Sequence, residues 1–368
     1  MKKLMSFCLM FIVCLSSSAH SKELSELSWD DVIIQAKQEK SVVWYQWYFQ
    51  ERFRNTVTAF EAKYGIDVKI AEGSHNANLQ KLIVESRRDK GDIDVISLAG
   101  SDLVKIKASI LYDSLSEILP NGSKLNYDIE GKNNHGIAPA FWGNQTGIAY
   151  NPSLIKEAEL PQTVEDFANY FNSHPGKFGV NTINGGSGPA FIQSIVRNIA
   201  TDLNFKSDEP SKSNLEKLHE AWEWFNRNES NFILTASNID SLNRINGGEL
   251  AIAPAWEDQL AGLQKSGEIS KNIKFYIPEM KMPGGGNVVA IPKNAKHPAA
   301  ALLFIQWLTS KETQTELNTV YGSAPQNPDA SDEFALVPAS QRINSTVWAN
   351  KLLSDAIIND FINKVTLN

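Results

Sequence analysis

The apolar and polar positions of this chain alternate between strand-like and helix-like spacing over its first hundred residues. Short runs rich in β-branched residues predict strands at 42–45, 66–70 and 93–98. Between them, apolar residues recur every three or four positions and predict helices at 52–64 and 79–88. Strands that alternate with helices favour a parallel sheet with right-handed crossovers. We therefore expect an α/β unit at the start of the mature chain.

The middle of the chain repeats this pattern. Helix-like spacing at 163–171 precedes an apolar strand at 178–182, and a glycine-rich turn leads into a helix at 190–200. A serine-to-glutamate capping box opens a longer amphipathic helix at 213–226. Near the end, 298–308 has the spacing of another helix. A second α/β unit is therefore expected.

Two segments differ from both patterns. The segment 136–152 contains a proline and internal glycines, which weaken a strand interior, so one continuous strand is not expected there. The segment 247–258 has a similar build of turn, short apolar run, proline and aromatic residue. Strands that leave one sheet and enter another would show this pattern. We expect two lobes hinged near 141–146 and 253–257 around a ligand cleft.

The first residues predict a secretory signal peptide at 1–21. Lys2 and Lys3 precede an apolar stretch, which is shorter than the roughly 20 residues that a membrane helix needs. Both cysteines, Cys8 and Cys14, lie in this signal. Neither follows a small residue, so lipid attachment is not expected. The mature chain would lack disulfides and thiolate ligands, and its length allows two hydrophobic cores without them.

The charge of the chain excludes some partners. The formal charge is −7, and removal of the two signal lysines makes it −9. An acidic chain without a basic run is not expected to bind nucleic acid, because neutralisation of phosphates dominates that binding. It is also not expected to dock on an anionic membrane surface.

No motif in the sequence predicts catalysis. The chain lacks a Gly-x-Ser-x-Gly elbow, a His-Glu-x-x-His pair, a P-loop and a dinucleotide fingerprint. The six histidines have no metal-ligand spacing, and only His75, after a predicted strand, is kept as a site candidate. The glycines 284–286 are interpreted as a flexible loop. We expect no enzyme activity, no metal and no cofactor.

Several segments together carry a resemblance to a known family; they are 41–47, 91–96, 136–152, 247–258, 287–298 and 304–310. In this order they resemble type II bacterial extracellular solute-binding proteins, the capture component of ABC importers. The most similar group binds polyamines, thiamine, iron or related small solutes. The resemblance covers most of the mature chain, and it specifies the family better than the ligand.

The resemblance implies a two-lobed α/β fold, each lobe a mostly parallel sheet flanked by helices, joined by two crossover strands. Lobe one would comprise 22–140 plus 256–319, and lobe two 144–254 plus 321–368. It implies a monomeric periplasmic protein that closes on a small polar solute and delivers it to a membrane permease. Two alternatives stay open: a secreted enzyme or carbohydrate-processing protein on a similar fold, and a ligand sensor for a membrane receptor.

Candidate ligand contacts follow from one rule, that ligands bind beyond the carboxyl ends of the strands in open α/β sheets. The loops after the predicted strands, the two crossovers and one turn of lobe two satisfy it. The residues chosen in this way are Gln46, Trp47, Tyr48, Ser74, Gly100, Ser101, Trp142, Asn144, Gln145, Asn184, Gly185, Ser187, Trp256, Glu257 and Asp258.

The aromatic candidates allow two interpretations, because a tryptophan at a strand end is often a core residue. We assign Trp44 to the core and Trp47, Trp142 and Trp256 to the cleft. Aromatic walls beside carboxylates suit a cation, which gains about 0.5–2 kcal/mol over a ring face. They also suit a sugar that stacks on tryptophan. A thiamine- or polyamine-like amine is slightly favoured over a sugar.

The sequence also bears on two other ligand classes. The turn at Asn184 to Ser187 precedes a helix, whose free N–H groups could hold a phosphate or carboxylate. The same turn could simply cap that helix through Ser187. Bare ferric iron is not favoured, because iron binders of the family commonly present adjacent tyrosines and this sequence has no Tyr-Tyr pair.

Overall fold

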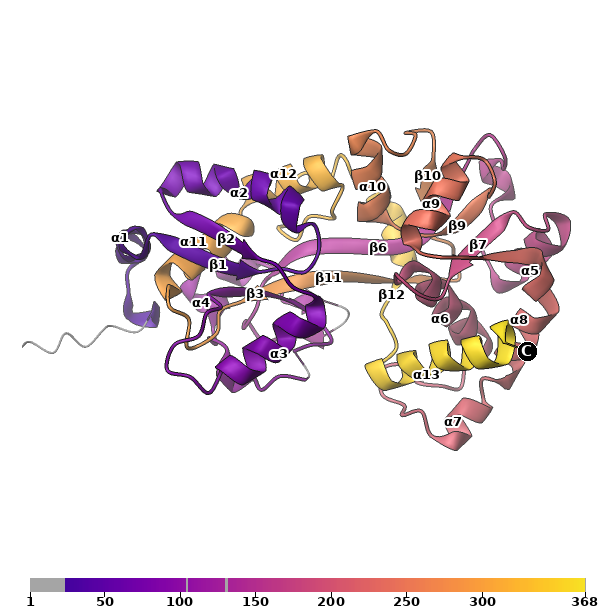
Figure 1. Cartoon of the computed structure of the whole chain (residues 1–368), viewed down its shortest axis with the longest axis horizontal. Coiled ribbons are helices and arrows are strands. Elements are labelled where there is room, and N and C mark those ends of the chain that lie inside the picture. The colour runs from indigo at the N-terminus through magenta and orange to yellow at the C-terminus, as the bar shows by residue number, and fades with distance from the viewer. Residues whose placement is uncertain (1–23, 104, 130–131, 368) are drawn as a thin grey trace, which may run out of the picture.

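The computed structural model describes residues 24–103, 105–129 and 132–367, so the predicted signal peptide lies outside the described residues. Two α/β halves lie side by side, and strands β6 and β11 run between them (Figure 1). None of the described helices is long and apolar enough to cross a membrane. The helices are α1 Trp29–Glu39, α2 Gln50–Tyr64, α3 His75–Glu85, α4 Leu115–Ile118, α5 Val164–Ser173, α6 Ser187–Ile199, α7 Lys212–Glu216, α8 His219–Asn228, α9 Asn238–Asn246, α10 Glu257–Ser266, α11 Pro298–Leu308, α12 Lys311–Tyr321 and α13 Lys351–Phe361.

The strands form one extended sheet in the order β2-β1-β3-β11-β6-β9-β7-β8. At each end the pairs are parallel, β1 with β2 and β3, and β7 with β8 and β9. Helices flank both ends, which confirms the expected α/β fold (Figure 1). The strands are β1 Ser41–Tyr45, β2 Asp67–Ala71, β3 Val95–Ala99, β4 Asp128–Ile129, β5 Lys132–Asn133, β6 Ala140–Tyr150, β7 Phe178–Asn181, β8 Phe232–Thr235, β9 Ile252–Trp256, β10 Lys274–Tyr276, β11 Met282–Ala290 and β12 Ser345–Thr346.

Strand β6 corrects one expectation, because its 11 residues are continuous. The proline that argued against a long strand, Pro139, lies just before it. The glycines serve close packing rather than a break. A Cβ on Gly147 would collide with the carbonyl oxygen of Tyr276 on the neighbouring strand β10. A single strand therefore passes from one half of the molecule into the other.

The second connection also differs from the expectation. Strand β9 pairs antiparallel with 146–150 of β6 and stays in the second half. Strand β11 instead pairs with 140–145 of β6 and then with β3 of the first half. The glycines 284–286, interpreted as a flexible loop, lie inside β11. A Cβ on Gly286 would collide with the carbonyl oxygen of Trp142, so the small residue permits close pairing.

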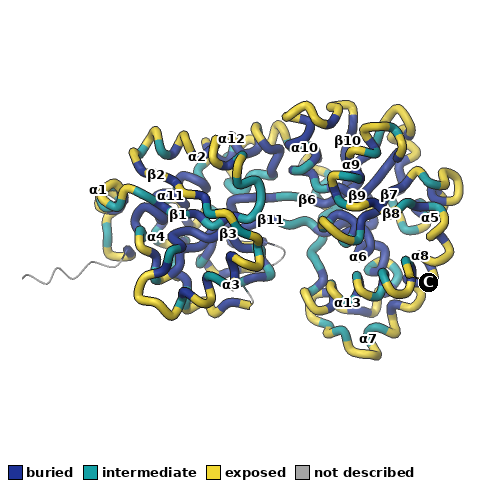
Figure 2. The backbone as a smooth tube through the Cα atoms, viewed as in Figure 1, coloured by how far each residue is buried: buried dark blue, intermediate teal, exposed yellow. Residues whose placement is uncertain are grey.

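Each half contains a large hydrophobic cluster of buried residues. In Figure 2 the buried stretches of the backbone run through the interior of both halves. Trp44 is fully buried in the first, as expected, and its Nε1 donates to Ser97 at 2.9 Å. Leu260 and Leu263 of α10 belong to the second cluster. The start of the segment 256–319, expected in lobe one, therefore packs with the second half, because α10 follows directly after β9.

The predicted helix at 213–226 is divided into α7 and α8. At the junction, Leu218 donates to the carbonyl of Leu215 and Ala221 to that of Leu218, so the turn is tightened to a three-residue spacing. Ser211, rather than the expected Ser213, caps α7. The helix at 298–308 is confirmed with its predicted bounds.

Candidate functional site

A cavity of about 400 Å³, hereafter the aromatic cavity, lies where both halves meet the connecting strands. The first half contributes the loop after β1 and the end of β3, and the second half contributes the end of β9 and the start of α9 and α10. These are carboxyl ends of strands, where open α/β sheets bind ligands. Its lining residues are Trp47, Tyr48, Phe49, Ala99, Asn144, Asn238, Trp256, Asp258, Gln259, Gly285, Gly286 and Asn287.

Trp47 and Trp256 bring one partly exposed indole from each half to the aromatic cavity. The Trp47 ring packs against His75 in a tilted arrangement, with centroids 4.4 Å apart, and His75 Nε2 lies 2.5 Å from the carboxylate of Asp102. The Trp256 ring stacks on Trp348 at 6.1 Å. Each indole is thus packed against an aromatic neighbour. His75 supports Trp47 and does not itself line the cavity.

Trp142 differs from the expectation of a cleft wall, because the structure buries it completely. Its ring packs against Tyr48, Phe53 and Tyr321, with centroids 5.4–5.6 Å apart. Its Nε1 donates to Asp258 Oδ2 at 2.9 Å. Trp142 therefore positions the carboxylate of Asp258 from the core of the first half and offers no face to the cavity.

Asp258 is a buried carboxylate whose partners are uncharged donors. Oδ2 accepts from Trp142 and, at 3.4 Å, from Asn144 Nδ2, while Oδ1 accepts from the backbone of Gln259 at 2.9 Å. Burial raises the pKa of Asp258, although the bonds from Trp142 and Asn144 act in the opposite direction. No lysine, arginine or histidine is among the described residues that line the cavity.

Other polar atoms around Asp258 are buried and lack a hydrogen-bond partner among the described residues. They include the acceptors Asn144 Oδ1 and Gln259 Oε1. Burial raises the pKa of Tyr48 well above its usual value, and the side chain of Gln46 acts in the opposite direction. Such atoms are costly unless something bonds to them.

Glu257 faces a different environment from its neighbour. Its carboxylate accepts from Arg342 at 2.9 and 3.1 Å and from the backbone of Val337 at 3.2 Å. Burial raises the pKa of Glu257 to about 7, although the charge of Arg342 acts in the opposite direction. Glu257 does not line the aromatic cavity, so its expected ligand contact is replaced by an ion pair within the protein.

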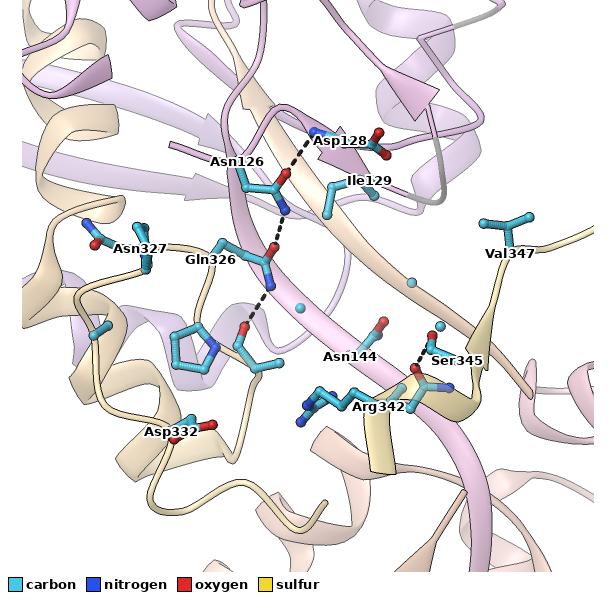
Figure 3. Close-up of a pocket in the computed structure, with 18 of the residues that line it drawn as sticks. Asn126, Asp128, Ile129, Asn144, Gln326, Asn327, Asp332, Arg342, Ser345 and Val347 are labelled. Carbon is cyan, nitrogen blue, oxygen red and sulfur yellow. Dashed lines mark hydrogen bonds between the residues drawn. The ribbon is translucent and has the colours of Figure 1, made fainter. Parts of the chain in front are cut away.

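A second, larger cavity of about 630 Å³, hereafter the amide cavity, is lined by Arg342 (Figure 3). Gln145 lines the same cavity. Gln145 donates to the carbonyl of Met282 at 3.0 Å and accepts from Ser345 at 2.8 Å. Asn126 and Gln326 are bonded to each other at 2.8 Å. Asn144 lines both cavities, which meet at β6. Gln145 therefore belongs with the amide cavity.

The predicted turn of lobe two is capped internally. Ser187 is the first residue of α6, and its backbone N–H donates to Asn238 Oδ1 at 3.3 Å. The N–H of Gly188 donates to Asn181 Oδ1 at 3.1 Å. Asn184 donates to the carbonyl of Ala236, and Gly185 is exposed. Two of the N–H groups that an anion would use are therefore already occupied.

The remaining candidates also lie outside the aromatic cavity. Ser74 caps α3 by accepting from the backbone of Ala77 at 3.3 Å, and Gly100 and Ser101 form the turn after β3. The sequence analysis missed Asn238, Gln259 and Asn287. Asn287 follows the glycines 284–286 in β11, and Gln259 follows Glu257 and Asp258. Both residues are therefore next to positions that the sequence analysis discusses.

Among the described residues, no group of three or more histidine, cysteine, aspartate or glutamate side chains could hold a metal ion.

Comparisons with known proteins agree with this architecture. A family model of bacterial extracellular solute-binding proteins matches residues 55–344. The chain is 25% identical over 293 residues to the putrescine-binding periplasmic protein SpuD of Pseudomonas aeruginosa, covering 76% of this chain and 77% of that protein. It is 23% identical over 293 residues to the Fe(3+)-binding periplasmic protein of Serratia marcescens, with 77% and 78% covered.

In fold, the chain is similar to the spermidine/putrescine ABC transporter substrate-binding protein PotD from Streptococcus pneumoniae. The TM-score is 0.65 at 14% identity, covering 88% of this chain and 98% of that one. The family match spans most of the chain and agrees with strands β6 and β11 joining two α/β halves. The chain therefore belongs to the bacterial extracellular solute-binding proteins.

Proposed function

We propose that this protein acts in the periplasm and binds a small polar organic solute, cationic or rich in hydroxyls, in the aromatic cavity. The observation that carries the proposal is the meeting of two partly exposed indoles, Trp47 and Trp256, beside the buried carboxylate of Asp258. The two rings come from different halves, so a solute between them would contact both. A membrane permease would receive the closed complex.

An amine is the favoured solute class. A cation gains about 0.5–2 kcal/mol over an aromatic face, and it would also give Asp258 the charged partner that the described residues do not supply. One relative is named for putrescine, which agrees with this class. A sugar is the second candidate, because amides such as Asn238 and Asn287 line the same cavity and can bond to hydroxyls.

Ferric iron is not proposed, although another relative is named for it. Ferric iron is a hard cation and takes several anionic oxygen ligands. Asp258 is the sole carboxylate among the described residues that line the aromatic cavity, and Tyr48 is the sole tyrosine. Burial raises the pKa of Tyr48 well above its usual value, which opposes the phenolate that a metal would need.

Closure would bend the two connecting strands. We propose a hinge at 141–146 of β6, as the sequence predicts, and a second at 284–287 of β11, which pairs with it, in place of 253–257. Lobe one would then comprise 24–140 and 291–321, and lobe two 147–281 and 345–367. A ligand shifts the equilibrium toward closure because it contacts both lobes only when they are closed.

Export would require cleavage of the predicted signal near residue 21, and N-terminal sequencing of the exported protein would show the site. A chemosensory role would use the same closed form, presented to a receptor instead of a permease. Crosslinking of the ligand-saturated protein in its host would separate the two, since each role predicts a different membrane partner.

A thermal-shift screen of amines, vitamins, sugars and phosphonates, followed by calorimetry, tests the proposal. The best solute should bind the parent and bind Trp47→Ala about tenfold or more weakly. Trp222→Ala, in the core of the second half, is the control and should retain the affinity while folded. Scattering should show compaction on saturation. A solute whose affinity does not change in Trp47→Ala or Trp256→Ala would contradict this cavity as the site.

A further inference from the structure

The described residues that line the aromatic cavity carry negative charge but no positive charge. Among its described lining residues, Asp258 carries the one carboxylate, and none carries a positive charge. Two acidic side chains close to this lining already have cations. Glu257 is paired with Arg342, and the carboxylate of Asp102 contacts both His75 and Lys105. The cavity can therefore neutralise a single positive charge.

We propose that the solute carries one primary ammonium group and an otherwise uncharged body. This inference rests on the proposed function and deepens it by fixing the charge and the substitution of the ligand. A dication would place its second charge in the same cavity without a carboxylate to pair with. A buried unpaired charge costs far more than a buried neutral group, so charge number should decide selectivity among otherwise similar amines.

The acceptors around Asp258 specify the type of cation. Asn144 Oδ1 and Gln259 Oε1 are buried without a hydrogen-bond donor among the described residues, and both side chains line the cavity with Asp258. Together with the carboxylate, they would present three acceptors to the ligand nitrogen once the lobes close. A primary ammonium has three N–H donors, whereas a quaternary ammonium has none. Methylation of the nitrogen would therefore leave buried acceptors unsatisfied.

The uncharged body of the solute would lie between the indoles of Trp47 and Trp256. Asn238 and Asn287, whose amides also line the cavity, would bond to a terminal hydroxyl or a similar neutral polar group. Because these groups are amides rather than carboxylates, they discriminate in favour of a neutral end. An amino alcohol matches one carboxylate and a pair of amides, and the diamine of the same length does not.

Calorimetry with matched pairs tests the proposal. The probes are the straight-chain amino alcohols of about three to six carbons, the diamines of the same lengths, and the N-trimethylated form of each amino alcohol. In at least one length, the amino alcohol should bind about tenfold more tightly than its diamine and than its trimethylated form. Diamines that bind as tightly at every length would overturn the proposal, and so would the absence of binding by any amino alcohol.

A variant links the preference to the acceptors. Gln259→Met keeps the size of the side chain and removes an oxygen that has no partner among the described residues, so the fold should be unaffected. The preference for the primary over the trimethylated ammonium should fall about fivefold or more. Gln80→Met, on the exposed side of α3, is the matched control. An unchanged preference in Gln259→Met would contradict the role of this acceptor.

Failure of this inference and failure of the proposed function give different results. A dication, a quaternary amine or a sugar that binds tightly and loses affinity in Trp47→Ala would leave the aromatic cavity as the site and refute the single-ammonium inference. A best solute whose affinity is the same in the parent, Trp47→Ala and Trp256→Ala would refute the cavity itself.

Discussion

Glu257 and Asp258 are adjacent in sequence and equally acidic, yet they serve different environments. Glu257 is bonded to Arg342 beside the amide cavity, and its negative charge is matched within the protein. Asp258 lines the aromatic cavity and receives hydrogen bonds from neutral donors, Trp142 and Asn144. The two carboxylates begin α10 together, where the helix dipole stabilises negative charge.

Under the proposed function, the difference separates a structural carboxylate, Glu257, from one that would pair with the ligand, Asp258. A buried ion pair satisfies both of its charges, and removal of one partner leaves the other uncompensated. A carboxylate held by neutral donors is oriented but still lacks a positive charge. Glu257 should therefore matter for folding, and Asp258 for binding. The predictions below test this division, from the largest expected effect to the smallest.

Trp142→Ala should lower the free energy of unfolding by about 3–5 kcal/mol, the usual cost of removing a large buried aromatic side chain. The side chain is fully buried and its Nε1 orients Asp258. Urea denaturation followed by circular dichroism measures the change. Trp142→Phe is the milder comparison, since it keeps most of the ring and removes the hydrogen bond. A variant with parental stability that has lost only solute binding would instead support the original cleft-wall prediction.

The stability should also depend on pH through Glu257. Because burial raises the pKa of Glu257 from 4.5 to about 7, the folded state binds more protons than the unfolded state between these values. The stabilisation that protonated Glu257 gives to the folded state is therefore fully present below pH 4.5, and it is lost as the pH rises through about 7. The loss amounts to roughly 3 kcal/mol at most, from 1.36 kcal/mol per unit of pKa shift.

Denaturation at a series of pH values measures this slope. In Glu257→Gln the fall in stability between pH 5 and 8 should be smaller than in the parent, since the titrating group is gone. Other groups titrate in this range, so the difference between the two proteins is the quantity to compare. Identical slopes would show that Arg342 keeps Glu257 ionised throughout, and that its pKa is not raised.

The sequence predicted much of the fold because local patterns determine it. The helix at 298–308 and the parallel strands at both ends follow from apolar spacing and caps. The continuity of β6 does not. Glycines in a strand can mark a break, or they can make room for a close neighbour. At Gly147 the neighbour is β10, which lies more than a hundred residues away in sequence, so local patterns do not reveal it.

The candidate site was predictable only in part. Trp47, Tyr48, Trp256 and Asp258 line the aromatic cavity at or just after strand ends, as the strand-end rule expects, whereas Asn144 lines it from the middle of β6. That rule selects loops, but it does not say which face of a strand or helix a side chain takes. Trp142 and Asn144 share a face of β6, where both bond to Asp258, 116 and 114 residues away in sequence. That pairing exists only in the folded chain.

Asp258→Asn should weaken amine binding by about 1.5–3 kcal/mol, the usual contribution of a hydrogen bond to a charged group. Asparagine keeps an oxygen for Trp142 Nε1, so the fold should be retained. Because burial raises the pKa of Asp258 and a bound cation favours its ionised form, affinity in the parent should rise with pH through that pKa. Calorimetry should show little change for Glu257→Gln beside it. An equal loss in both variants would contradict the division between the two carboxylates.

Trp256→Ala should have the smallest effect, a loss of about 0.5–2 kcal/mol in solute binding, because only one ring face is removed. The indole is partly exposed and stacks on Trp348, so its removal should cost less stability than that of the buried Trp142. Trp256→Phe should restore part of the affinity if the ring face is what the solute contacts. If the phenylalanine variant binds no better than the alanine variant, the indole acts through Trp348 and the shape of the second half, and the carboxylate of Asp258 provides the main contact from α10.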